Sequence, residues 1–193
     1  MKEEIIQFWE GLYKEGKMPW DFGGVPFRLS SFIDSQESPK SVLIPGCGSA
    51  YEAKFLADKG FYVKAVDISK AAIERASEII GDTNNVDLEV ADFFDLKESE
   101  FDFIYERAFL CSFNPDLRAS FVEHCSRLLS DKGRIFGFYF VDEERESGPP
   151  FPIEAKALKK LMSCLFDLVE DEVVEDGLDV FGGKERWQVW QKK

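Results

Sequence analysis

Two glycines and an aspartate have the spacing of sites that bind nucleotides. Gly46 and Gly48 follow the apolar run of residues 41–44, and Asp67 lies 21 residues after Gly46, at the end of a second strand-like run. Glycines let the backbone approach a ligand closely, and the start of the helix that follows offers N–H groups to an anion such as a carboxylate. An acid placed like Asp67 accepts hydrogen bonds from ribose hydroxyls. The spacing therefore predicts a ligand that contains adenosine.

The third glycine of the dinucleotide fingerprint G-x-G-x-x-G is missing. The sequence at this place is Gly46-Cys47-Gly48-Ser49-Ala50-Tyr51, so a tyrosine stands where close packing of the helix requires glycine. There is also no acid, base or histidine arranged for hydride transfer. These features disfavour NAD and favour S-adenosylmethionine, which has an adenosine and a carboxylate but no pyrophosphate. Asp92 and Phe93 follow the third strand-like run, where they could bind the adenine.

Length and charge limit the classes of partner. The chain has 193 residues, with 37 Asp+Glu against 24 Lys+Arg and a net charge of −13, and its length suits one domain over residues 1–193. An acidic surface repels nucleic-acid phosphates and anionic lipids, and no basic cluster longer than a pair interrupts it. No apolar run approaches the roughly 20 residues of a membrane span. We expect a cytoplasmic monomer that binds neither nucleic acid nor membrane.

Cysteine and histidine are too few and too scattered for metal chemistry. The four cysteines form no C-x-x-C pair and His124 is the only histidine, so neither a metal site nor a disulfide framework is predicted. Ser/His/Asp hydrolysis is disfavoured for the same reason. We expect Cys47 and Cys111 to be small buried apolar groups and His124 to be structural.

Strand-like and helix-like segments alternate along the chain, which is typical of an α/β fold. Strands are expected at residues 41–44, 61–66, 86–90, 101–105, 134–141, 166–174 and 186–191. Helices are expected at 3–14, after the glycine turn, from the cap Ser69 to Gly81, at 115–129 and at 153–164. Asp131-Lys132-Gly133 is expected to turn the chain into the fifth strand. The last two strands have no helix between them, which predicts an antiparallel hairpin at the edge of a seven-stranded Rossmann-like sheet with helices on both faces.

Aromatic residues are concentrated near the start of the chain. They make up 15% of the residues, and two of the four tryptophans, Trp9 and Trp20, fall within the first twenty positions. Trp9 and Tyr13 share one stripe of the first helix, which by itself would indicate core packing. The sequence Pro19-Trp20-Asp21 that follows makes core packing of this stripe the less favoured interpretation. A sulfonium cation is attracted to aromatic faces by about 0.5 to 2 kcal/mol per contact.

These motifs together resemble the thiopurine S-methyltransferase-like family of S-adenosylmethionine-dependent methyltransferases, which includes thiol and halide methyltransferases. The resemblance covers nearly the whole chain. It is carried by Phe8-Trp9-Glu10, Pro19-Trp20-Asp21, Leu43-Ile44-Pro45-Gly46-Cys47-Gly48, Val66-Asp67-Ile68-Ser69, Ala91-Asp92-Phe93-Phe94, Glu106-Arg107 followed by Asn114-Pro115, and Gly148-Pro149-Pro150-Phe151. It implies a class I methyltransferase sheet whose last strand is antiparallel, a flap formed by residues 1–30 as a lid over the cofactor, and S-adenosylhomocysteine as the product.

The resemblance also implies roles for individual residues. Arg107 matches an arginine of the thiopurine branch, where plant halide and thiol enzymes carry tyrosine, and this favours sulfur acceptors. Tyr139 is expected to face the acceptor, unless a shift of one or two residues places Phe140 there. Tyr13 departs mildly from the tryptophan that is frequent in the family. The residues that the resemblance implies for cofactor binding are Trp9, Tyr13 and Trp20 over the cofactor, Gly46 and Gly48 at the methionine part, Asp67 at the ribose, Asp92 and Phe93 at the adenine, and Arg107. The implied catalytic residues are Arg107 and Tyr139.

Transfer of a methyl group to a small-molecule sulfur needs little besides alignment. It is an in-line displacement at carbon, for which positioning supplies roughly 7 to 11 kcal/mol, and a thiol with a pKa near about 8.5 ionises readily beside an arginine. The alternatives are methylation of oxygen, nitrogen or halide, and a protein that binds S-adenosylmethionine without catalysis. Arg107 could also be a structural partner of Glu106 or Asp116. A last group, Glu143, Glu144 and Glu146, forms either a solvated loop face or an entrance that disfavours anionic acceptors.

Overall fold

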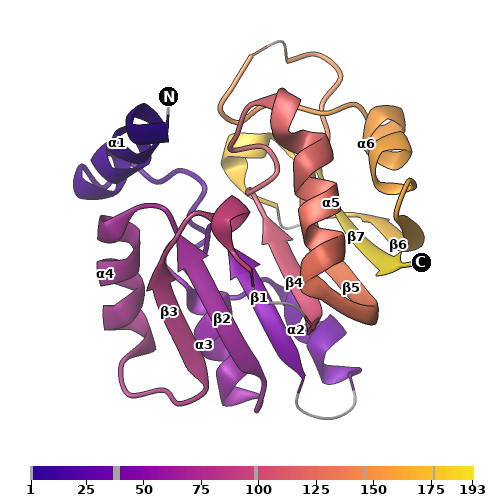
Figure 1. The fold of residues 1–193 in the computed structure, drawn as a ribbon. Coiled ribbons are helices and arrows are strands. Elements are labelled where there is room, and N and C mark those ends of the chain that lie inside the picture. Colours follow the sequence, from indigo (N-terminus) through magenta and orange to yellow (C-terminus); the bar gives the residue numbers. More distant parts are fainter. Residues whose placement is uncertain (1, 37–39, 98–99, 146, 176) are drawn as a thin grey trace. The chain divides into compact units, whose positions relative to one another are not determined.

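A computed structural model describes residues 2–36, 40–97, 100–145, 147–175 and 177–193. The chain divides into two compact units, Met1–Leu96 and Lys97–Lys193. Figure 1 labels the helices and strands of both units. The strands follow the order β3-β2-β1-β4-β5-β7-β6 in a seven-stranded sheet. Within the described residues, no helix is both long and apolar enough to cross a membrane. One continuous domain over residues 1–193 stays a prediction.

The first unit contains three parallel strands whose buried sides explain their apolar sequences. They are β1 (Ser41–Pro45), β2 (Tyr62–Asp67) and β3 (Val86–Val90), with β2 paired to both neighbours in parallel. The helices are α1 (Lys2–Lys14), α2 (Phe27–Asp34), α3 (Tyr51–Asp58) and α4 (Lys70–Ile80), and a short 3-10 turn η1 (Phe93–Asp95) closes the unit. Both α3 and α4 pack against β2. The end of β2, where Asp67 lies, is therefore held from several sides.

Helix α4 begins and ends where its capping residues predict. The Ser69 hydroxyl accepts a hydrogen bond from the Ala72 N–H at 3.1 Å, and Gly81 ends the helix with a φ of 57°. Helix α2 was not predicted, because the glycines and Pro26 before it indicate a loop. It exists because it buries Leu29, Phe32 and Ile33.

The second unit contains the rest of the sheet. Its strands are β4 (Phe101–Arg107), β5 (Leu129–Phe140), β6 (Phe166–Val173) and β7 (Glu185–Lys192). The helices are α5 (Arg118–Leu128) and α6 (Ala155–Met162), with 3-10 turns η2 (Pro115–Leu117) and η3 (Asp179–Phe181). Strands β4 and β5 are parallel, whereas β7 is antiparallel to both β5 and β6. The predicted seven-stranded α/β sheet with an antiparallel last strand and an edge hairpin is confirmed.

Strand β5 begins earlier than its sequence suggests. Asp131-Lys132-Gly133 was predicted to be a turn, but the strand starts at Leu129, which pairs with Phe101. The register then shifts, so that Arg134 pairs with Phe103, and Lys132 takes a φ of 60° inside this irregularity. The turn prediction was wrong because Leu129 is buried in a pairing with a distant strand, which local residue types do not reveal.

Candidate functional site

The glycine turn after β1 leads into the start of α3, where an anion is predicted to bind. Gly46 and Gly48 have φ values of 59° and 54°, which favour glycine. A Cβ atom at Gly48 would lie 2.8 Å from the Tyr13 hydroxyl oxygen, so a side chain there would displace that ring. The N-cap of α3 is Ala50, at a φ of 57°, and it makes no side-chain capping hydrogen bond. The start of a helix favours an anion, so this position is consistent with the predicted carboxylate site.

Asp67 is buried at the end of β2, next to this turn. Its Oδ2 accepts a hydrogen bond from the Gly48 N–H at 3.1 Å, and its Oδ1 accepts one from the Ser69 N–H at 2.9 Å. Burial raises the pKa of Asp67 to about 6, although these backbone donors oppose the rise. An ionised carboxylate can accept about four hydrogen bonds, so capacity remains for ribose hydroxyls. The geometry of Asp67 thus fits the predicted cofactor.

Three aromatic residues of the predicted flap form one cluster. The ring centroids of Trp9 and Trp20 are 5.2 Å apart and those of Tyr13 and Trp20 are 5.9 Å apart, both in edge-to-face arrangements. The indole N–H of Trp20 lies 3.3 Å from the Tyr13 hydroxyl oxygen, to which it donates. Helix α1, which carries Trp9 and Tyr13, has no buried residue. The aromatic stripe of α1 is therefore not part of a core.

Two carboxylates attach the flap to the site. Glu10 accepts hydrogen bonds from the Ser69 hydroxyl at 2.7 Å and from the Ala71 N–H at 2.9 Å, at the start of α4. The Ala71 N–H is the main reason that the pKa of Glu10 is lowered to about 2. Asp21 accepts a hydrogen bond from the Ser49 hydroxyl. Neither role was predicted, although Glu10 and Asp21 stand within the motifs Phe8-Trp9-Glu10 and Pro19-Trp20-Asp21.

Asp92 and Phe93 lie at the start of η1 and their role at the adenine stays a prediction. The Asp92 Oδ1 accepts a hydrogen bond from the Phe94 N–H at 3.0 Å, and its Oδ2 lies 2.8 Å from the Lys2 amine. Phe93 is 3% exposed. An adenine amino group bound by Asp92 would share that carboxylate with Lys2.

Tryptophan fluorescence tests the flap. Titration with S-adenosylhomocysteine is expected to change the emission, because Trp9 and Trp20 are half-buried and Trp20 donates to the Tyr13 hydroxyl that lies close to Gly48. A variant carrying Trp9→Phe and Trp20→Phe keeps the fully buried Trp187 and Trp190 and is the control, since its emission should not respond. A titration in which the unaltered chain stays silent while calorimetry reports binding would exclude the flap.

Arg107, at the end of β4, is buried among aromatic and acidic groups of the second unit. Its side chain is 6% exposed, its guanidinium carbon lies 4.6 Å from the centroid of the Phe138 ring, and its Nε lies 3.9 Å from Glu185 Oε1. The sequence offered Glu106 and Asp116 as ionic partners and did not suggest Glu185. The buried guanidinium is a fixed positive charge beside a planar apolar surface.

Tyr139 and Arg107 do not share a face of the sheet. Arg107 pairs with Phe138 in the register of β4 and β5, and side chains alternate along a strand, so Tyr139 is directed to the opposite face. Phe140 falls on the Arg107 side, where its ring stacks on Phe181 at 4.7 Å. Burial raises the pKa of Tyr139 well above its usual value, so its hydroxyl stays protonated. The catalytic role of Tyr139 stays a prediction, and so does the alternative, Phe140, which shares the face of Arg107.

Glu106 shapes the turn that follows Arg107. One carboxylate oxygen accepts hydrogen bonds from the N–H groups of Phe109 at 3.0 Å and Leu110 at 2.8 Å. Ala108, which precedes Phe109 in this turn, takes a φ of 57°. Burial raises the pKa of Glu106 to about 8. Gly137 in β5 pairs with Glu106, and the two backbones come so close that a Cβ atom at Gly137 would lie 1.7 Å from the Glu106 carbonyl oxygen. Only glycine fits at this position.

The remaining nucleophile candidates are buried. Burial raises the pKa of Cys47 and of Cys111 well above the usual value, so both stay thiols. All four cysteines are free. His124 is 5% exposed and its Nδ1 lies 3.0 Å from an Arg127 nitrogen. Within the described residues, no three His, Cys, Asp or Glu side chains are grouped to hold a metal ion.

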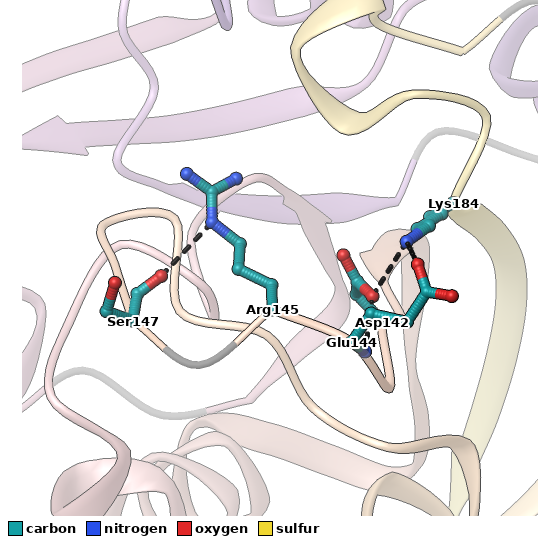
Figure 2. A network of polar contacts seen from close by, with 5 residues as sticks. All are labelled: Asp142, Glu144, Arg145, Ser147 and Lys184. Atoms are coloured by element: carbon teal, nitrogen blue, oxygen red, sulfur yellow. Dashed lines mark hydrogen bonds and ion pairs between the residues drawn. The ribbon is translucent and has the colours of Figure 1, made fainter.

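The acidic loop after β5 is partly neutralised. Figure 2 shows Lys184 between Asp142 and Glu144, with its amine 2.9 Å from a carboxylate oxygen of each. The Nε of Arg145 donates to the Ser147 carbonyl at 3.1 Å. Glu143 is exposed, and Glu146 lies outside the described residues. Glu144 therefore carries a paired charge, and the two interpretations of this loop stay open.

Comparison with known proteins places these features in one family. A sequence model described as thiopurine S-methyltransferase matches residues 5–193. The chain is 28% identical to an Arabidopsis thaliana protein named "Probable thiol methyltransferase 2", over 97% of this chain and 87% of the relative. It is 23% identical to a thiopurine S-methyltransferase of Acinetobacter baylyi, over 88% and 89%. A solved Burkholderia thailandensis 1,6-didemethyltoxoflavin-N1-methyltransferase shares the fold, with a TM-score of 0.81 and 17% identity over 99% of this chain and 88% of that one.

Proposed function

The chain belongs to the thiopurine S-methyltransferase family and is an S-adenosylmethionine-dependent methyltransferase, and we propose that its acceptor is the sulfur of a small aromatic thiol. The observation that carries this acceptor is Arg107, whose buried guanidinium lies on the Phe138 ring. The positive charge of this guanidinium matches the negative charge of a thiolate. We also propose that the protein is a monomer located in the cytoplasm, and both of these proposals rest on the sequence alone.

In this proposal the first unit holds the cofactor. Asp67 accepts the ribose hydroxyls, and the start of α3 after Gly48 binds the methionine carboxylate. Trp9, Tyr13 and Trp20 cover the bound molecule and present aromatic faces to the sulfonium. S-adenosylmethionine supplies an electrophilic methyl group when bound. The flap then excludes water, which keeps the thiol as the reacting nucleophile.

Arg107 makes a separate catalytic base unnecessary. A positive charge near a thiol favours its ionised form and lowers its pKa, so the proton leaves to solvent before the sulfur attacks. The sulfur–methyl bond forms as the sulfonium–methyl bond breaks, and S-adenosylhomocysteine leaves. Tyr139, Cys47 and Cys111 stay protonated at neutral pH, so none of them is suited to remove a proton from the acceptor.

A panel of acceptors tests the proposal. Methyl transfer is measured with aromatic thiols, a thiopurine, sulfide, thiocyanate and iodide, with kcat/KM compared across the panel. We expect aromatic thiols to have the highest kcat/KM and iodide the lowest, because Arg107 matches the arginine of the thiopurine branch and not the tyrosine of the halide enzymes. Highest activity on iodide or thiocyanate would contradict the acceptor assignment. Binding of S-adenosylhomocysteine without transfer to any acceptor would favour a non-catalytic role.

A further inference from the structure

We propose that Arg118 and Lys184 are positioning residues that hold the two limbs of an acceptor loop and thereby set the affinity for the methyl acceptor. We define the acceptor loop as residues 142–145 and 147–152. The inference rests on the proposed function, because it assigns the acceptor to this part of the chain. All the contacts that carry it lie within the second unit.

The acceptor loop is closed at its base. Val141 and Ile153 form a parallel bridge, and the Asp142 N–H donates to the Ile153 carbonyl at 3.2 Å. A loop whose ends are joined in this way is a compact surface element. Its position then depends on a few contacts made by each limb.

The limb that returns to the base cannot hold itself by main-chain hydrogen bonds. Pro149, Pro150 and Pro152 have no N–H group, so Phe151 is the only main-chain donor from 149 to 152, and it donates to the Cys111 carbonyl at 2.6 Å. The carbonyls of Phe151 and Pro152 need a donor from elsewhere. One nitrogen of Arg118 supplies it, at 3.0 Å to Phe151 and 2.8 Å to Pro152.

The limb that leaves β5 is held by Lys184. Its amine lies 2.9 Å from Asp142 and 2.9 Å from Glu144, as Figure 2 shows, and its carbonyl accepts the Val141 N–H at 2.8 Å. The Asp142 side chain is 8% exposed, and the hydrogen bond from Lys184 holds the pKa of that carboxyl below its usual value. Lys184 directly precedes the first residue of β7, so the backbone that carries this side chain is fixed by the sheet.

The acceptor loop is linked to Arg107 through the strands themselves. It follows the carboxyl end of β5, whose Phe138 pairs with Arg107, and it contacts Cys111, in the turn after Arg107. Ligands of open α/β sheets bind outside the carboxyl ends of the strands. A loop held in place before binding reduces the ordering cost of association. Loss of either anchor should therefore weaken acceptor binding more than the chemical step.

Kinetics of an Arg118→Met variant test the inference. We expect the KM for an aromatic thiol to rise about tenfold while kcat and the affinity for S-adenosylhomocysteine change less than about twofold. Arg118→Lys should recover part of the loss, because an amine can still reach one carbonyl. Lys184→Met should raise KM by a smaller factor, since its side chain is 38% exposed. Arg127→Met, on the same helix α5, is the matched control and should leave KM unchanged.

Hydrogen exchange separates this inference from the proposed function. In Arg118→Met the Phe151 amide should exchange at least tenfold faster, with little change in the exchange of β4 and β5. An unchanged KM in a folded Arg118→Met variant would overturn the inference, as would parallel losses in KM, kcat and cofactor affinity, which indicate a merely structural role. If the unaltered chain methylates no thiol, the proposed function fails, and unchanged Phe151 exchange in the variant would then reject the anchor as well.

Discussion

Replacing Asp67 with Asn is expected to weaken the binding of S-adenosylhomocysteine about a hundredfold. The carboxylate is held by the Gly48 and Ser69 N–H groups in a buried position at the end of β2. A hydrogen bond to a charged group contributes about 1.5 to 3 kcal/mol. Losing the charge that accepts hydrogen bonds from two ribose hydroxyls should therefore reduce the binding free energy by about 3 kcal/mol. Calorimetric titration measures the change directly. Asp58→Asn, at the exposed end of α3, is the control and should bind like the unaltered chain.

The same titration has a predicted pH dependence. Because burial raises the pKa of Asp67 to about 6, the carboxylate is ionised above that pH and increasingly protonated below it. A protonated Asp67 loses the charge that attracts the hydroxyls, so affinity should fall as pH falls through about 6. Asp67→Asn has no such group and should show no corresponding step. A constant affinity of the unaltered chain from pH 5 to pH 8 would remove Asp67 from the cofactor site.

Replacing Arg107 with Met is expected to lower kcat/KM for an aromatic thiol about a hundredfold, with the affinity for S-adenosylhomocysteine changed less than threefold. The guanidinium is the charge that stabilises the thiolate, and a charge-assisted contact of about 3 kcal/mol accounts for a factor of this size. Arg107→Lys should retain part of the activity, because it keeps the charge but loses the planar contact with Phe138.

Two further measurements make the Arg107 experiment decisive. Removing Arg107 leaves Glu185 without this buried cation, so thermal unfolding must be followed to separate instability from lost catalysis. Arg186→Gln, on the neighbouring residue of β7, removes a half-exposed arginine that pairs with Asp171 and is the matched control. Equal losses in thiol turnover and in cofactor affinity would assign Arg107 to the cofactor instead of the acceptor.

Much of the fold could be predicted because it follows from local chemistry. The apolar run of β1 indicates a strand buried on both faces, and Ser69 and Gly81 mark the ends of α4 through their own side-chain and backbone properties. Helix α2 and the start of β5 could not be predicted in this way. Both depend on burial against distant residues, such as the pairing of Leu129 with Phe101.

In the candidate site, too, the features set by local residue types could be predicted and those set by distant contacts could not. Glycine and aspartate at a fixed spacing, followed by aromatic motifs, were enough to predict an adenosine-containing cofactor, and the aromatic residues do gather in one cluster. The anchors of the flap and of the acceptor loop were not predicted. Glu10 bonds to Ser69, 59 residues away, and Arg118 bonds to Phe151, 33 residues away, contacts that only folding creates.

The sequence by itself determined the fold class, the cofactor and the family, because these depend on residue types at short and regular spacing. Only the tertiary structure decided on which face of the sheet each acceptor candidate lies. Side chains alternate along a strand, so a shift of one residue in register moves a ring to the opposite face. The pairing of Arg107 with Phe138 therefore groups Phe140 with Arg107 and separates Tyr139 from it.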